Sequence, residues 1–177
     1  MTEMQDLMKR LDKKIRKLET KTTYEIPAIS IEFGGVDRNE FESAGLDCDF
    51  ADTIFASIMA DHKFDDNFQL NGYIISHYTH IKEQLHDLKA LYESNGEESR
   101  QLVITFPPLH CFQYIQFMFR QNEIIVIGNM RSCDFQKKFL MDSYITYRCA
   151  VALLSILELP KLDVYQVMNI GSLHIYK

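Results

Sequence analysis

The sequence lacks the features of secreted, membrane-spanning and disulfide-stapled proteins. No apolar run follows its first residues, as a secretory signal would require. The longest apolar stretch, Cys149 to Leu157, contains Ser155 and is too short to cross a bilayer. The four cysteines of this 177-residue chain show no CxxC spacing, which favours a reduced, intracellular protein over a disulfide or zinc framework. We therefore expect a cytoplasmic protein that is not bound to membranes.

Positive charge and metal-ligand patterns are also scarce. The formal net charge is −6, from 19 Lys and Arg against 25 Asp and Glu. Broad binding to nucleic acid or to anionic membranes is therefore not expected. His77 and His80 have a helical spacing, but the sequence offers them no third partner, so no metal site is predicted.

The apolar content is sufficient for one core. Hydrophobic residues make up 46% of the sequence, and this length fits a single domain. Periodicity predicts helices at residues 1–20, 50–59, 74–92 and 143–157, and strands at 24–33, 101–106, 111–120, 124–130 and 164–176. Residues 37–49 are expected to be irregular, and the last strand to break near 169–171. Because helices and strands are mixed without a βαβ cadence, the predicted fold class is α+β with a largely antiparallel or mixed sheet.

Residues 1–20 differ in pattern from the domain predicted over residues 21–177. Their apolar positions follow helical spacing, with Lys and Arg on the other face. Such a helix can serve as a docking or dimerisation element. We favour the simpler interpretation, an N-terminal amphipathic helix that covers the core.

The hairpin predicted over residues 111–130 brings a cysteine close to an arginine. If Gln121-Asn122 forms a two-residue loop, position i faces position 243 − i, and Cys111 lies across from Ser132 with Arg131 one step away. A guanidinium at that place favours the thiolate, which is the reactive form of cysteine. The alternative is a buried cysteine beside a surface arginine.

Three motifs resemble those of the thymidylate synthase family, in the same order. Cys111 is followed five residues later by Gln116-Phe117, and then by Arg131-Ser132-Cys133-Asp134. Gly171-Ser172-Leu173-His174-Ile175-Tyr176 comes near the end. The family pattern is a Pro-Cys-His nucleophile loop with Gln-Phe beyond it, an Arg-Ser-x-Asp segment and a late Gly-Asp-x-His-Ile-Tyr strand. The resemblance is clearest over residues 71–176, and a register that puts Leu109 in the nucleophile position needs an insertion that Cys111 does not.

The resemblance implies a fold, an assembly and a reaction. The fold is a mixed sheet with flanking helices, and the sheets pack back to back in a homodimer that binds a pyrimidine nucleoside monophosphate. The reaction is C5-methyl or C5-hydroxymethyl transfer. In it the Cys111 thiolate adds to C6 of the base, and C5 then takes a one-carbon unit from the cofactor 5,10-methylenetetrahydrofolate. Direct binding of nucleic acid is not expected.

The resemblance also assigns site residues. Cys111 and Arg131 are implied to be catalytic. The implied substrate-binding residues are Arg100, Ser132, Asp134, Asp142, His174 and Tyr176.

These residues divide by the part of the nucleotide they would contact. Ser132 and Arg131 would hold the phosphate, and Arg100 would reach it from the other subunit. Asp134 would approach the base through its backbone. His174 and Tyr176 would bind the ribose, and their spacing of two places both side chains on one face of a strand. An ordinary half-buried terminal strand gives the same spacing.

Departures from the family pattern keep other functions open. Phe112 replaces the histidine after the cysteine, and Ser172 replaces the aspartate of the late strand. Asn71-Gly72 stands where the family has Tyr-Gly, Glu42 is the nearest candidate for the general base, and the C-terminal segment that closes over folate is missing. The alternative is a catalytically degenerate thymidylate synthase-like protein that binds a nucleotide or acts as a dimeric scaffold.

Asp142 bears on the choice of base. Eleven residues after the arginine, the family has an asparagine that pairs with uracil, whereas this chain has Asp142. An ionised carboxylate only accepts hydrogen bonds, which suits the amino group of cytosine and not O4 of uracil. The family's cytidylate hydroxymethylases are similar in carrying an aspartate here, so the resemblance implies a preference for dCMP or CMP. The alternative is that Asp142 is only the N-cap of the helix predicted from residue 143.

Overall fold

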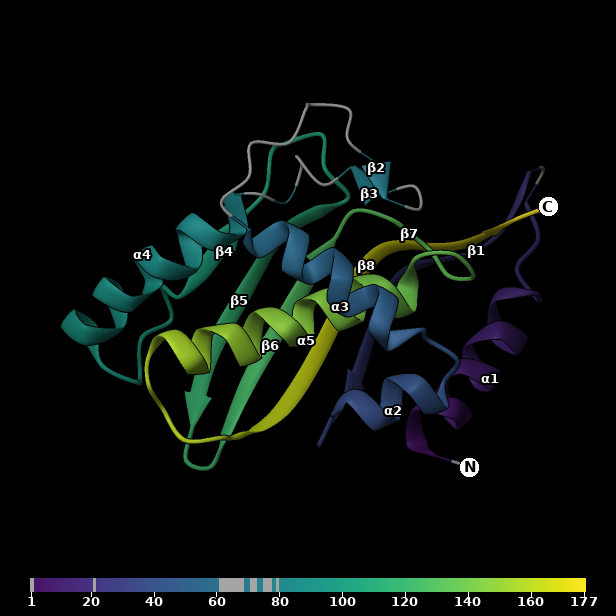
Figure 1. The fold of residues 1–177 in the computed structure, drawn as a ribbon. Coiled ribbons are helices and arrows are strands. Elements are labelled where there is room, and N and C mark those ends of the chain that lie inside the picture. The colour runs from purple at the N-terminus through teal and green to yellow at the C-terminus, as the bar shows by residue number, and fades with distance from the viewer. Residues whose placement is uncertain (1, 21, 61–68, 71–72, 75–77, 79) are drawn as a thin grey trace.

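A mixed sheet forms the centre of the protein (Figure 1). The computed structural model describes residues 2–20, 22–60, 69–70, 73–74, 78 and 80–177. The main sheet has the order β1-β8-β6-β5-β4, and β7 pairs with β8 beyond the end of β6. The strand bounds are β1 Thr23–Phe33, β4 Val103–Thr105, β5 Phe112–Arg120, β6 Glu123–Met130, β7 Cys133–Asp134 and β8 Asp163–Tyr176. Strands β6 and β7 run parallel to β8 and the other pairs are antiparallel, so the predicted α+β class with a mixed sheet is confirmed.

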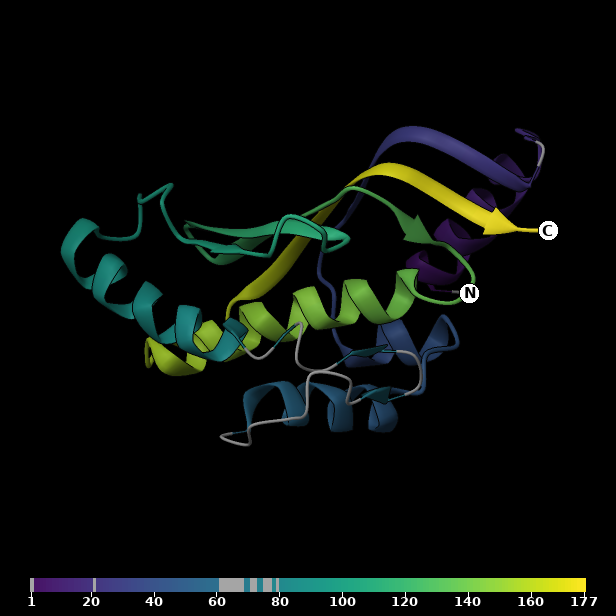
Figure 2. The same ribbon diagram turned by 90° about the horizontal axis from the view of Figure 1, so that it is seen from above.

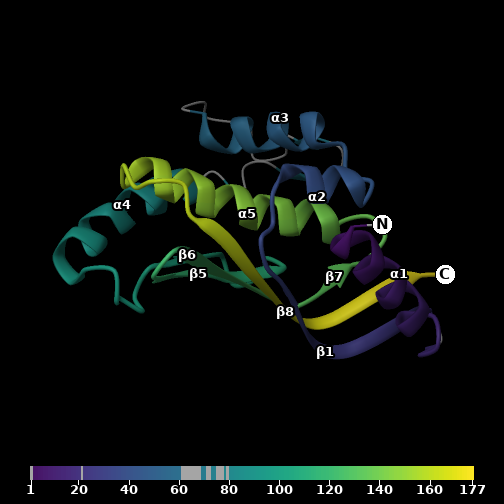
Figure 3. The ribbon, with the colours of Figure 1, turned by 90° about the horizontal axis from the view of Figure 1, so that it is seen from below.

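The helices all lie on one face of this sheet (Figures 2 and 3). Their bounds are α1 Glu3–Ile15, α2 Arg38–Ser43, α3 Cys48–Met59, α4 His80–Asn95 and α5 Phe139–Ile156. Helix α5 crosses the centre of the sheet, with Phe139, Ile145 and Leu153 fully buried. It is long and apolar enough to cross a membrane, but 61% of it is buried inside the fold, as befits a core helix. A separate two-stranded sheet pairs β2 Gln69–Leu70 with β3 Tyr73–Ile74. Asn71-Gly72, which stands where the family has Tyr-Gly, lies outside the described residues.

Local sequence explains where several helices begin. Thr2 and Gln5 form a capping box at the start of α1, and the carboxylates of Asp37 and Asp47 cap α2 and α3. Helix α2 falls in the segment that was expected to be irregular. Its six residues bury only Phe41, too little for a periodic signal.

The other differences from the predicted elements arise from tertiary packing. Helix α5 begins four residues earlier than expected because Phe139 and Met141 pack into the core, although no side chain caps it. Helix α4 begins at His80 rather than near residue 74. Strand β8 runs without a break through Gly171, held by β1 on one side and by β6 and then β7 on the other.

The N-terminal helix is part of the same core. It packs against β1, β8 and α2, and Met4, Leu11 and Ile15 on its inner face are buried. Its outer face carries ion pairs four residues apart, Arg10 with Asp6 and Arg16 with Asp12.

The opposite face of the sheet has no helix over it among the described residues (Figure 3). Side chains alternate along β5, β6 and β8, one buried under the helices and the next half-buried on this open face. Apolar and aromatic residues predominate there, namely Val103, Tyr114, Met118, Ile125, Ile127, Tyr165 and Val167.

Candidate active site

The β5–β6 hairpin has the predicted register over most of its length and departs from it at one bulge. From Arg120–Glu123 to Tyr114–Asn129 the paired residue numbers sum to 243, as expected. Between Tyr114 and Phe112 the register shifts by one, and Phe112 pairs with Met130. Cys111 therefore lies opposite Arg131, whose backbone N–H donates to the Cys111 carbonyl at 2.7 Å. The predicted backbone pairing of Cys111 with Ser132 is wrong by one residue, because a bulge adds an unpaired residue to one strand.

Cys111, Arg131 and Ser132 nevertheless meet at the open end of the hairpin. Cys111 is exposed, and its Sγ lies 3.9 Å from Oγ of Ser132. A guanidinium nitrogen of Arg131 donates to the Leu109 carbonyl at 3.4 Å, so this arginine spans the loop that leads to the cysteine. The alternative of a buried cysteine is wrong for Cys111, although it holds for the other three.

Gly171 lets β8 approach the backbone at the end of β6 closely. A Cβ atom on this residue would lie 2.7 Å from the carbonyl oxygen of Arg131, closer than such atoms approach in folded proteins. Any larger residue would therefore displace the backbone that carries Arg131 and Ser132.

Strand β7 then brings the Arg-Ser-x-Asp segment alongside the end of β8. Asp134 pairs with His174, and the next residue, Phe135, donates its N–H to the His174 carbonyl at 2.8 Å. The His174 and Tyr176 rings lie on one face of the strand, 4.9 Å apart and nearly perpendicular.

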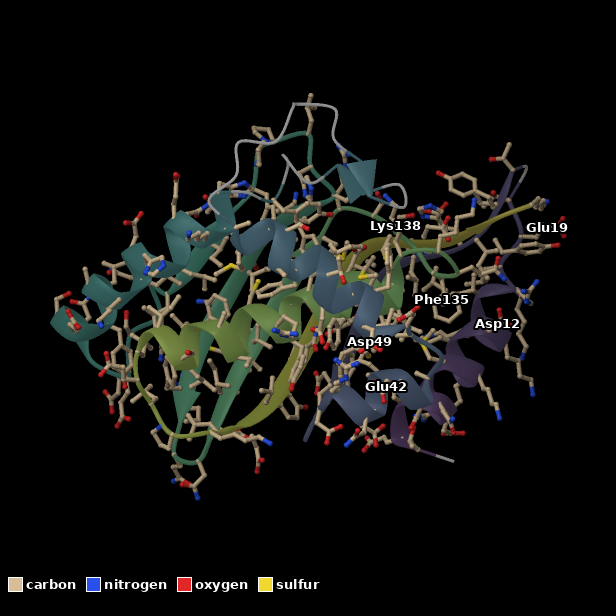
Figure 4. The ribbon with its side chains drawn as sticks, viewed as in Figure 1. Asp12, Glu19, Glu42, Asp49, Phe135 and Lys138 are labelled. Carbon is tan, nitrogen blue, oxygen red and sulfur yellow. The ribbon has the colours of Figure 1, made fainter. Side chains whose placement is uncertain are left out.

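The carboxylate of Asp134 holds the loop before α5. Its Oδ1 accepts the backbone N–H groups of Gln136 and Lys137, both at 3.1 Å. Figure 4 shows Phe135 and Lys138, from the same loop, beside the start of α5. One oxygen of this side chain is thus engaged by its own loop.

Asp142 is buried in the first turn of α5, with only 3% of its surface exposed. Lys138 is the N-cap of this helix, and the N–H of Asp142 donates to the Lys138 carbonyl. The interpretation of Asp142 as an N-cap is therefore wrong. Its Oδ2 accepts a hydrogen bond from Sγ of Cys133 at 3.6 Å, between two buried side chains.

Tyr78 and His110 belong to the same cluster, although sequence reasoning did not select them. The Tyr78 ring meets His110 edge-on at 4.8 Å, and His110 stacks on Phe106 at 5.0 Å. Burial, with the charges of Asp142, Cys111 and Cys133, raises the pKa of Tyr78 well above its usual value. The phenol therefore stays protonated and can donate a hydrogen bond.

The sequence carried a signal for His110 but none for Tyr78. His110 directly precedes Cys111. Its Nδ1 accepts the N–H of Phe112 at 3.1 Å, and this hydrogen bond holds the loop around Cys111. Tyr78 fitted the apolar face of a helix predicted from residue 74. Because α4 begins only at His80, Tyr78 precedes the helix, and the N–H of Ile81 donates to its carbonyl.

Arg100 lies at the other end of the hairpin. Its carbonyl accepts from the side chain of Gln116 at 2.9 Å, five residues along β5 from Cys111, which corresponds to roughly 16 Å of extended strand. Arg100 lines a hollow of about 430 Å³ with Glu97, Glu98 and Arg120 at the hairpin tip. In one chain it is therefore remote from Cys111.

The acidic residues of α2 and α3 form a separate network. Arg38 pairs with Glu42 at 3.0 Å and also with Asp49 and Asp52. Figure 4 shows Glu42 and Asp49 close together where α2 and α3 meet. Glu42, considered as a general base, is thus exposed and engaged with Arg38. No group of three or more His, Cys, Asp or Glu suited to a metal occurs in the described part of the chain.

Comparisons with known proteins identify the fold. No family model and no curated protein matches the sequence. Among solved structures, thymidylate synthase from T4 phage matches with a TM-score of 0.62 and 16% identity, covering 99% of this chain and 77% of that chain. The thermostable thymidylate synthase A from Bacillus subtilis matches with a TM-score of 0.58 and 14% identity, covering 99% of this chain and 80% of that chain. The chain therefore has the thymidylate synthase fold.

Proposed function

We propose that the protein transfers a methyl or hydroxymethyl group to C5 of a pyrimidine nucleoside monophosphate, in the cytoplasm. The observation that carries this proposal is the exposed Cys111 thiol, 3.9 Å from Oγ of Ser132 and paired through its backbone with Arg131. These three residues lie together at the end of a hairpin, in a chain with the thymidylate synthase fold. A nucleophile beside a hydroxyl and a guanidinium suits a substrate that carries both an electrophilic ring and a phosphate.

Cys111 acts first in the proposed reaction. Its thiolate forms a bond to C6 of the base, and the electron pair of the C5–C6 double bond makes C5 nucleophilic. After C5 has gained the one-carbon unit, it loses its proton. Departure of the Cys111 sulfur from C6 then restores the double bond. Arg131 and Ser132 hold the phosphate during these steps, and the protonated Tyr78 is available as a hydrogen-bond donor beside them.

The residues beside Cys111 fit a flat heteroaromatic cofactor such as 5,10-methylenetetrahydrofolate. Leu109 has 87% of its surface exposed, and the ring of the next residue, His110, stacks on that of Phe106. An exposed leucine next to aromatic rings is a suitable surface for a pteridine ring to cover. When bound, the cofactor would supply the one-carbon unit at the oxidation level of formaldehyde. It would also supply the hydride that a methyl product requires, whereas a hydroxymethyl product would take up water instead.

We propose that Asp142 selects cytosine. Its carboxylate is buried, and the charges of Asp142 and Cys111 both act on Tyr78, so the three lie in one cluster. An ionised carboxylate accepts from the cytosine amino group but opposes O4 of uracil. An unpaired buried contact of this kind costs roughly 1–3 kcal/mol, about 5-fold to 150-fold in affinity.

The base preference can be measured directly. We expect dCMP or CMP to bind more tightly than dUMP or UMP in titration calorimetry. Asp142→Asn should narrow or reverse this preference, because an amide can both donate and accept. If the variant changes thermal stability alone and keeps the wild-type preference, Asp142 does not read the base.

The open face of the sheet supports a homodimer. Seven half-buried apolar and aromatic residues lie on that face, and a second copy packed back to back would remove them from water. Arg100, which is remote from Cys111 in its own chain, would then act at the site of the partner. The dimer thus completes the phosphate site.

Release of tritium tests the reaction itself. A nucleotide labelled with tritium at C5 should release the label to water when methylenetetrahydrofolate is present, because C5 loses its proton after the transfer. Cys111→Ser should abolish the release while binding persists. A wild-type protein that binds nucleotide but releases no tritium would instead be a catalytically degenerate binder, and one that binds none would be a scaffold.

A further inference from the structure

A buried thiol–carboxylate pair joins the sheet to α5 next to the proposed base site. Cys133 and Asp142 are each only 3% exposed. The Cys133 Sγ lies 3.6 Å from Oδ2 of Asp142 and 3.7 Å from the Asp134 carbonyl. Of these two acceptors the carboxylate is charged, and hydrogen bonds to charged acceptors are the stronger ones. The thiol proton is therefore directed mainly to Asp142.

Cys133 can act here only as a donor. Burial and the negative charge of Asp142 raise the pKa of the Cys133 thiol well above its usual value. It therefore keeps its proton and is not a second nucleophile. A hydrogen bond donated to a carboxylate also favours the ionised form of that carboxylate, and the ionised form is the one that accepts from cytosine.

The two partners are fixed by different elements. Cys133 is set by the pairing of β7 with β8, where it lies opposite Leu173. Asp142 is set by the first turn of α5, through its backbone bond to Lys138. Because a carboxylate is planar, holding Oδ2 on Cys133 also fixes the direction of Oδ1. The orientation of the Asp142 carboxylate thus depends on a donor that belongs to the sheet.

We propose that Cys133 is a positioning residue that orients the Asp142 carboxylate as a hydrogen-bond acceptor and thereby sets the choice of cytosine over uracil. This inference rests on the proposed function. The role differs from packing alone, because a residue that only fills space would affect stability and leave the ratio of the two affinities unchanged.

The test compares side chains that differ in their ability to donate at position 133. Cys133→Val fills a similar volume without a donor, Cys133→Ser keeps an O–H donor, and Cys149→Ala is the control. Cys149 is likewise a buried cysteine, and it lies seven residues beyond Asp142 on α5. Affinities for dCMP and dUMP are measured by titration calorimetry. We expect Cys133→Val to lower the dCMP-to-dUMP affinity ratio roughly 5-fold to 10-fold, and Cys133→Ser and Cys149→Ala to keep it within about 2-fold of wild type.

The possible failures can be told apart. A Cys133→Val protein that keeps the wild-type ratio overturns the positioning role and leaves the proposed function intact. A wild-type protein that binds neither nucleotide overturns the proposed function, and the inference with it. If Cys133→Val does not fold, the wild-type protein still provides a test through its infrared S–H stretching band. Asp142→Asn should shift the Cys133 band by replacing a charged acceptor with a neutral one, and an unchanged band overturns the inference.

Discussion

Exposure distinguishes Cys111 from the other three cysteines. Cys48, Cys133 and Cys149 are buried, whereas Cys111 lies open beside Ser132. We expect iodoacetamide to modify Cys111 much faster than the others, since alkylation needs access to the sulfur. Bound dCMP should protect it. Mass spectrometry of the labelled peptides measures both effects, and equal labelling of all four thiols, or labelling that nucleotide does not slow, would contradict an active-site role.

The buried Cys149 should make the protein less stable at alkaline pH. Burial raises the pKa of its thiol from 9.0 to about 12. In the unfolded chain the thiol loses its proton near pH 9, while in the folded protein it keeps it. The stabilising contribution is therefore complete below pH 9 and is lost as the pH rises toward 12.

Urea denaturation can isolate this effect. Between pH 9 and pH 12 the free energy of unfolding of the wild-type protein should fall more steeply than that of Cys149→Ala. For each pH unit above 9, the loss of unfolding free energy in the wild-type protein should exceed that in Cys149→Ala by about 1.4 kcal/mol. Parallel curves for the two proteins would mean that the Cys149 thiol ionises as readily in the folded state as in the unfolded chain.

At the level of elements, the close approach of β8 to the end of β6 positions the segment that carries Arg131 and Ser132. Gly171→Ala would bring a methyl group against the Arg131 carbonyl, which belongs to the backbone and cannot turn aside. Gly128→Ala is a matched control on β6, because its methyl group would meet the flexible end of Met168. We expect Gly171→Ala to lower the free energy of unfolding by roughly 1–3 kcal/mol and to weaken nucleotide binding.

The two measurements separate local strain from damage to the site. Gly128→Ala should lose less stability in urea denaturation and should keep its nucleotide affinity in titration calorimetry. If both variants bind nucleotide equally well, the approach of Gly171 to Arg131 is irrelevant to the site.

The elements that were predicted well show a regular pattern of apolar residues over a long stretch of consecutive sequence. The apolar alternation of β5 and β6, with a short polar loop between them, was enough to predict the hairpin and the meeting of Cys111 with Arg131. The bulge near Gln113 was not predicted, because Phe112 is the only residue of β5 beyond it, too few to reveal the change of phase in the alternation. Helix α2 was missed because six residues carry too little periodicity.

Residues whose placement depends on long-range packing could not be predicted at all. Tyr78 reaches the site only because α4 starts late and its ring packs on His110. The predicted start of α5 was wrong because it also depends on long-range packing. Phe139 joins the helix because it is buried, and no side chain caps the helix. Asp142 therefore lies in the first turn and not at the cap that was its alternative interpretation.

At the scale of the whole molecule, the arrangement of layers is one-sided. The five helices of the described residues all lie on one side of the sheet, while the other side presents half-buried apolar side chains (Figure 3). We expect sedimentation to show a dimer at micromolar concentration. Ile127→Glu, at the centre of the open face, should shift it to monomer because it would bury a charge. Val151→Glu is the control, since Val151 is an exposed residue on the helical side. A monomeric wild-type protein would contradict the back-to-back arrangement.

The last prediction concerns Arg100, which we expect to serve the site of the partner. Arg100→Ala should weaken nucleotide binding while the protein stays dimeric, and Arg120→Ala, which removes a charge from the same hollow, should have a smaller effect. The Arg100→Ala and Cys111→Ala proteins are then mixed in equal amounts and allowed to exchange subunits, at a nucleotide concentration too low for Arg100→Ala alone to bind. Half of the dimers become mixed, and each mixed dimer has one site with an intact Cys111 and an intact partner arginine. Tritium release should therefore recover to about a quarter of the wild-type rate. If Arg100 served its own chain, no site in the mixture would have both residues, and the activity would stay at the level of the separate variants.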